Sequence, residues 1–161
     1  MSNKSATPLT RRYTPPMRIL AIDYGAKRIG LALSDPTATL ARPLPFLPAR
    51  PDAPLAREIA LLAKKEDARL ILLGLPRHMN GSLGEAAVRV QAFALLLGQA
   101  TSVPVRLIDE RLSTVQAGRQ LHEAGRNARQ QRAKIDSEAA AVLLQGYLDS
   151  QPSSLPLPPD A

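Results

Sequence analysis

Two short apolar runs stand on either side of a polar segment in residues 17–35, MRILAIDYGAKRIGLALSD. Residues 19–22 and residues 29–33 have the length and composition of buried strands. Because the segment between them is short and contains Gly25, the spacing predicts a β-hairpin. The first strand ends on Asp23, and a carboxylate there is costly to dehydrate unless something compensates its charge. A bound cation is one such compensation, but this stretch alone slightly favours a hydrogen bond to the neighbouring turn.

The rest of the chain alternates strand-like runs with helical patterns. Pro43 and Pro45 would confine the first of the further strands to a sheet edge, because each removes a ladder donor. Ser82 and Glu85 have the spacing of a capping box at the start of a helix that would bury Ala86, Val90, Phe93, Ala94 and Leu97. A strand meander followed by alternating strands and helices predicts an α/β domain with a mixed sheet. Strands are expected over residues 39–46, 69–73 and 103–108, and helices over residues 55–66, 82–97, 113–123 and 136–149.

One folded domain is expected over residues 17–150. The flanking segments, residues 1–16 and 151–161, are polar or rich in Pro and Ser and are predicted to be disordered. The sequence has no Cys, which excludes disulfides, thiolate catalysis and Cys-ligated zinc. It also has no apolar stretch long enough to span a bilayer and no secretory signal pattern, so we expect a cytoplasmic protein without membrane attachment.

The formal net charge of +7 favours a polyanionic partner. Nucleic acid is favoured over a membrane surface, because no basic helix carries a bulky apolar face. A basic soluble enzyme without such a partner is the simpler alternative.

Acidic residues follow two of the expected core strands. Asp23 ends the first strand, and the pair Asp109 and Glu110 ends the strand at 103–108. Ligands gather at such strand ends in open α/β sheets. Since side chains alternate along a strand, only one member of the pair can point to the side of Asp23. Asp136 stands at the expected start of the last helix, where an N-cap role would explain it.

Together, these carboxylates suggest a metal site. Acids brought together repel each other and need a cation between them. With oxygen ligands, no Cys and few His, that cation would be Mg²⁺ or Mn²⁺. Such a site suits phosphoryl transfer, and Lys27, Arg28 and Arg111 could hold phosphates beside it. The simpler interpretation of each of these cations is a solvated surface charge.

Four motifs occur in order along the chain. They are DYGAKRIGLALSDP at 23–36, GLP at 74–76, DERLST at 109–114 and KIDSEAAAVLLQGYL at 134–148. Together they resemble the YqgF (RuvX) family of ribonuclease H-like proteins. Members of that family are described as Holliday junction resolvases and as nucleases that mature the precursor of the small ribosomal RNA.

The resemblance implies a ribonuclease H-like fold, with a mixed five-stranded sheet flanked by helices on both faces. It also implies a catalytic and metal-binding set of Asp23, Glu110 and Asp136, and it thereby chooses Glu110 over Asp109. One departure concerns the loop after Gly74, where many relatives have Asp before the turn glycine and this chain has Asn80 before Gly81. That difference puts a metal role for the loop in doubt.

The leading hypothesis is a metal-dependent endonuclease acting on four-way DNA junctions or precursor ribosomal RNA. A non-catalytic nucleic-acid- or ribosome-binding module of the same fold is the main alternative. An actin-like ATP-binding protein, suggested by the first motif, would need a second lobe for which the chain is too short. A homodimer is plausible, because two symmetric incisions suit a two-fold assembly. The residues expected to contact nucleic acid are Lys27, Arg28, Arg77, Arg111, Arg126, Arg129, Arg132 and Lys134.

Overall fold

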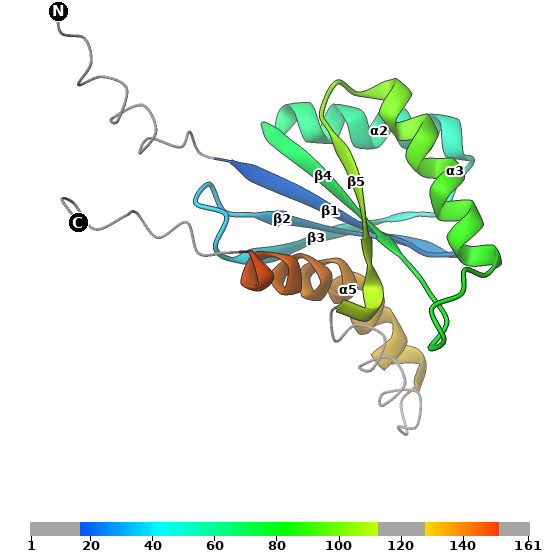
Figure 1. Cartoon of the computed structure of the whole chain (residues 1–161). Helices are drawn as coiled ribbons and strands as arrows, with labels where there is room; N and C mark the ends of the chain where they lie inside the picture. Colours follow the sequence, from blue (N-terminus) through cyan, green and yellow to red (C-terminus); the bar gives the residue numbers. More distant parts are fainter. Residues whose placement is uncertain (1–16, 113–127, 152–161) are drawn as a thin grey trace, which may run out of the picture.

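A five-stranded mixed sheet forms the centre of the computed structural model (Figure 1). The structure describes the backbone of residues 17–112 and 128–151 and the side chains of residues 17–111 and 138–151. The strand order is β3-β2-β1-β4-β5; β2 pairs antiparallel with both β1 and β3, and β4 pairs parallel with both β1 and β5. This arrangement confirms the predicted fold class. The strands are β1 (Arg18–Tyr24), β2 (Arg28–Ser34), β3 (Ala41–Pro48), β4 (Ala68–Leu75) and β5 (Val105–Asp109).

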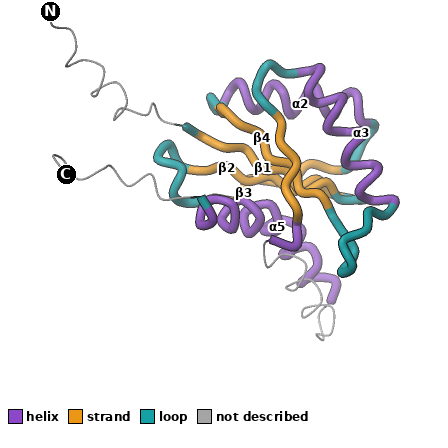
Figure 2. The backbone as a smooth tube through the Cα atoms, viewed as in Figure 1, coloured by secondary structure: helices purple, strands orange, loops and turns teal. Residues whose placement is uncertain are grey.

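Helices cover both faces of the sheet (Figure 2). Helices α2 (Asp52–Lys65) and α3 (Glu85–Ala100) lie on one face, and α5 (Ala128–Ser150) lies on the other. A single-turn 3-10 helix, η2 (Glu110–Leu112), follows β5 directly. None of the helices in the described part of the chain is long and apolar enough to cross a membrane.

Side-chain alternation along β1 divides the core into two layers. Leu20 and Ile22 belong to the layer that contains Phe93 of α3. Ile19 and Ala21 pack instead with Ala140 and Leu144 of α5 and other residues of that layer. Because successive side chains of a strand point to opposite faces, Asp23 continues the series of Ile19 and Ala21 on the α5 side.

The predicted hairpin and edge strand are present. Strands β1 and β2 pair in antiparallel register, with Asp23 opposite Gly30. Strand β3 has β2 as its neighbour and forms one edge of the sheet, which accommodates the prolines at 43 and 45. It begins and ends two residues later than the strand expected over 39–46, and α2 begins at Asp52, three residues before the expected helix start at 55.

The predicted capping box at Ser82 is wrong. Helix α3 begins at Glu85 after Gly84, and no side chain caps its first turn. The Ser82 hydroxyl instead donates to Asn80 Oδ1 at 2.6 Å, inside the preceding turn. The buried face of α3 contains Val90, Phe93 and Leu97, as predicted. Ala87 is buried instead of Ala86, and Ala94 is only half-buried.

The last helix also begins earlier than predicted. Helix α5 starts at Ala128, so Asp136 lies more than two turns inside it and cannot cap its N-terminus. Residues 128–135, ARQQRAKI, are mostly good helix formers. The prediction did not include them in the helix because the cluster of basic residues also suits a surface loop. The helix expected over 113–123, the predicted disordered segment 1–16 and, apart from Gln151, the predicted disordered segment 151–161 lie outside the described residues.

The turn between β2 and β3 makes stability depend on pH. Burial of the Asp35 carboxylate opposes ionisation, but hydrogen bonds from Thr37, Leu40 and Thr39 outweigh it and lower its pKa to about 2. The ionised group therefore stabilises the fold above pH 4, and that stabilisation is lost as the pH falls from about 4 to 2. We expect Asp35→Asn to lower stability at neutral pH and to flatten this part of the acid-denaturation profile, measured by urea unfolding at several pH values. A profile of unchanged slope would contradict this role.

Candidate active site

The site lies where the parallel strands β1, β4 and β5 end, and Asp23 is one of its two buried acids. Asp23 is only 5% exposed, at the next-to-last position of β1. Strand β1 pairs in parallel with β4, with Ile22 opposite Leu73. Continuing this register by one residue brings Asp23 beside Gly74. The hairpin thus fixes the carboxylate at the carboxyl end of the sheet on the α5 side.

Glu110 reaches the same place from the other side of β4. It is the first residue of η2 and is 4% exposed. Its Oε1 lies 2.9 Å from the point that a Cβ on Gly74 would occupy, and Leu143 Cδ2 of α5 also lies 2.9 Å from that point. Since β4 separates β1 from β5 and each strand spacing is 4.7–4.9 Å, the backbones that carry Asp23 and Glu110 are about 10 Å apart. The missing side chain at Gly74 therefore leaves room for an acidic side chain to approach from the β5 side.

Asp109 has a different environment. Its carboxylate accepts hydrogen bonds from Arg111, including one from Nη2 at 2.8 Å, and lies 3.3 Å from Arg77 Nε. The hydrogen bonds and charge of Arg111, with the charge of Arg77, hold the pKa of Asp109 below its usual value. The two acids thus have separate surroundings, as the strand alternation required. Glu110 lies against Gly74, and Asp109 is engaged by two arginines.

The third expected acid, Asp136, is placed by its backbone. It lies in α5, seven residues before the Leu143 that approaches Gly74. Positions 136, 140 and 143 share a helix face by their spacing, and Ala140 and Leu143 are buried. The side chain of Asp136 lies outside the described part of the chain. Among the side chains that are described, no group of three acids or histidines is arranged to hold a metal.

The expected nucleic-acid contacts fall into three groups. Lys27 is exposed in the turn of the hairpin, and the half-buried Arg28 lies over the ring of Phe46 at 5.4 Å. Arg77 and Arg111 meet at Asp109 beside the acidic site. Arg129, Arg132 and Lys134 lie in the first two turns of α5 with their side chains outside the described set, and Arg126 lies outside the described residues.

Sequence reasoning missed the part played by Gly74. It identified the residue as the end of a strand and as part of the GLP motif, whereas the structure shows that a side chain there would meet Glu110 and Leu143. A glycine closing an otherwise apolar buried strand was the available signal.

The tyrosine that follows Asp23 was also missed. Tyr24 stacks near Phe93, with ring centroids 4.9 Å apart, and donates a hydrogen bond to Asp52 of α2.

Comparison with known proteins decides the family. The model of the RuvX family, described as Holliday junction resolvase, matches residues 17–150. The chain belongs to the RuvX family. This match spans all of the strands and helices described above, and it confirms the family that the four motifs indicated.

Relatives of this RuvX protein carry a nuclease name. A protein of Anaeromyxobacter sp. (strain Fw109-5) is 45% identical over 135 residues, covering 84% of this chain and 98% of the relative. A protein of Roseiflexus sp. (strain RS-1) is 41% identical over 136 residues, with 84% and 96% coverage. Both are named "Putative pre-16S rRNA nuclease". The RuvX chain is accordingly a member of a nuclease family.

The fold has a counterpart among solved structures. T. thermophilus RuvC, determined in complex with a Holliday junction substrate, superposes with a TM-score of 0.53 and 13% identity, covering 83% of this RuvX chain and 95% of RuvC. At that identity the likeness concerns the fold, and it agrees with the ribonuclease H-like architecture.

Proposed function

We propose that this chain is a divalent-metal-dependent endonuclease that cleaves phosphodiester bonds in structured nucleic acid, either four-way DNA junctions or precursor ribosomal RNA. The observation that carries the proposal is the burial of Asp23 and Glu110 on the two sides of Gly74, at the carboxyl ends of the parallel strands. The two acids therefore lie at the end of the sheet where open α/β sheets bind their ligands.

The residues present suit a hard cation. Two carboxylates that are each at least 95% buried concentrate negative charge, which a divalent ion would neutralise. Their oxygen donors are the ligands that Mg²⁺ and Mn²⁺ prefer. Asp23 and Glu110 would hold the ion, with Asp136 as the third proposed ligand. When bound, such an ion activates water and stabilises charge on the phosphoryl and leaving oxygens.

The protein's own groups would then position the substrate. Arg77 and Arg111 both contact the carboxylate of Asp109, which places two guanidinium groups beside the residue that precedes Glu110. Guanidinium groups bind phosphate oxygens well, because their donors match the geometry of the phosphate. Lys27 and Arg28 at the hairpin, and the basic first turns of α5, would contact the phosphate backbone at other points. Homodimerisation stays a prediction.

A cleavage panel tests this function. Labelled four-way DNA junctions, DNA duplexes, single-stranded DNA and precursor ribosomal RNA are incubated with the protein in Mg²⁺, in Mn²⁺ and in EDTA. We expect cleavage of at least one branched or folded substrate with either metal and none in EDTA. Salt-sensitive binding without cleavage of any substrate would instead favour the non-catalytic module, because phosphate contacts alone give that behaviour.

A further inference from the structure

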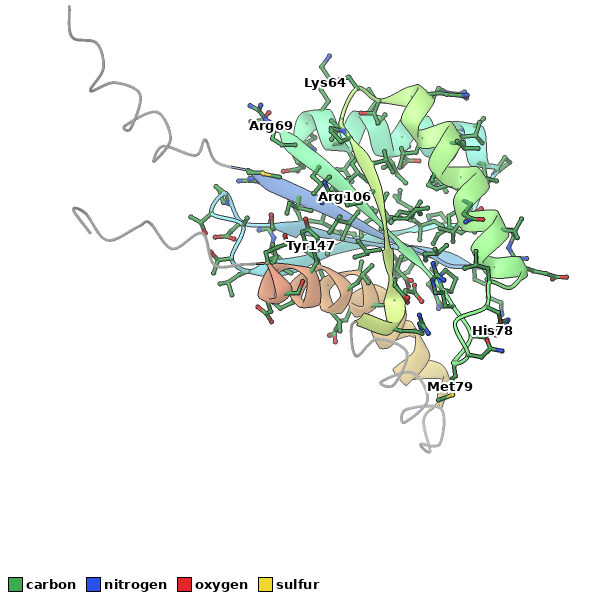
Figure 3. The ribbon with its side chains drawn as sticks, in the orientation of Figure 1. Lys64, Arg69, His78, Met79, Arg106 and Tyr147 are labelled. Carbon is green, nitrogen blue, oxygen red and sulfur yellow. The ribbon has the colours of Figure 1, made fainter. Side chains whose placement is uncertain are left out.

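The loop between β4 and α3, residues 76–84, presents an apolar side chain at its tip (Figure 3). Met79 at its tip is 88% exposed, more than any other large apolar side chain in the described part of the chain, and Leu83 is 42% exposed. Figure 3 shows Met79 projecting outward at the end of this loop, with His78 above it. A single exposed methionine is unremarkable on a protein surface. The contacts of the loop that carries Met79 distinguish it from other exposed apolar residues.

The loop is built as a tight turn. His78 N donates to Ser82 O at 3.0 Å, and Gly81 N donates to His78 O at 2.8 Å. Asn80 Oδ1 accepts from the backbone N of Ser82 at 2.9 Å and from its hydroxyl. Gly81 has φ of +86°, a conformation that glycine adopts without strain. The turn therefore holds Met79 at a fixed point of its tip.

Side chains from the site anchor this turn. Arg77 Nη1 donates to Gly81 O at 3.0 Å, while Arg77 Nε lies 3.3 Å from Asp109. Arg111 Nη1 lies 3.6 Å from the point that a Cβ on Gly81 would occupy. Arg77, one of the two arginines proposed to bind phosphates, thus links the turn to Asp109, the neighbour of Glu110, and Arg111 lies close to the turn.

We infer that Met79 is a positioning residue that inserts between unstacked bases of the substrate while Arg77 and Arg111 hold the neighbouring phosphates. Apolar side chains, methionine among them, act as such wedges in nucleic-acid complexes. The thioether is polarisable and flexible, so it can contact base faces of any sequence. The ligand would be a nucleic acid with unstacked bases, at a branch point or an internal loop. This inference rests on the proposed nuclease function and attributes to Met79 part of the selectivity for structured substrates.

A fluorescence experiment tests the wedge. The full chain with Asp23→Asn, which prevents cleavage, is titrated against a DNA four-way junction and a bulged RNA hairpin that carry 2-aminopurine at the unstacked position, and against a labelled duplex. We expect fluorescence of the branched substrates to rise on binding and that of the duplex to stay unchanged. Adding Met79→Gln should abolish the rise and weaken binding to the branched substrates about fivefold or more, the low end of what a base-stacking side chain contributes.

Leu95→Gln is the matched control. Leu95 is 72% exposed on α3 and has no part in the proposed site, so its variant should retain the fluorescence rise. The same rise in the Met79→Gln protein would overturn the wedge even if the wild type cleaves. A Met79-dependent rise together with a wild type that cleaves nothing would overturn the proposed function alone. Failure to bind any branched substrate would overturn both.

Discussion

Asp23→Asn is expected to reduce phosphodiester cleavage about a thousandfold or more, because bound divalent metal supplies several kcal/mol of transition-state stabilisation and each 1.36 kcal/mol is a factor of ten. The asparagine keeps the size of the side chain but removes the charge that would hold the ion. Nucleic-acid affinity should change by about twofold or less, since phosphate contacts by Lys and Arg supply most of the binding energy. Cleavage is measured in single-turnover assays, and affinity is measured by titration at fixed salt.

Asp67→Asn is the control for this variant. Asp67 carries the same carboxylate, but it stands just before β4, at the opposite end of the sheet, and its side chain is 79% exposed. Its φ of 55° is one that asparagine tolerates, so the substitution should leave both folding and cleavage unchanged. Thermal unfolding of Asp23→Asn should show one cooperative transition, as for the wild type, which separates a loss of cleavage from a loss of folding. Undiminished cleavage by Asp23→Asn would remove Asp23 from the site.

Gly74→Ala is expected to have the second largest effect. The added methyl would lie 2.9 Å from both Glu110 Oε1 and Leu143 Cδ2, so the carboxylate or α5 must shift. A displacement of about 1 Å at a catalytic group can cost about a hundredfold in rate, and overpacking of this kind costs about 1–3 kcal/mol of stability. Cleavage rates and denaturant unfolding of the same preparation would measure the two effects separately.

Gly98→Ala provides the matched comparison. Gly98 lies inside α3, and a Cβ there would meet nothing within 4 Å. This alanine should raise stability by up to about 1 kcal/mol, through helix propensity, and leave cleavage unchanged. Both substitutions reduce the conformational freedom of the unfolded chain similarly. The difference between their free energies of unfolding therefore reports mainly the contact made at position 74. Equal activities for the two variants would show that Glu110 does not need the space beside Gly74.

The sheet could be predicted because its pattern is local. The apolar runs that end at Asp23 and Gly74 are strands, and the prolines of β3 do lie at an edge. The start of α5 was missed because charged residues can read equally well as a loop or as the exposed part of a helix. Only the helix boundary at Ala128 shows that Asp136 cannot be an N-cap.

The candidate site was predictable in part. Strand alternation required that Asp109 and Glu110 have different surroundings, but it could not say which of them lies on the side of Asp23. That choice depends on the 3-10 turn after β5 and on the space over Gly74, which are tertiary features. The contact between Arg77 of the loop and Asp109 likewise joins positions 32 residues apart, and no local pattern carries it.

The most direct test is the rate of cleavage as a function of Mg²⁺ concentration, measured for the wild type and Asp23→Asn side by side on the substrate that the panel identifies. We expect no cleavage by the wild type in EDTA, a saturable rise of its rate with Mg²⁺, and no comparable rise for Asp23→Asn at any concentration. Cleavage by the wild type in EDTA, or the same metal dependence for both proteins, would contradict it.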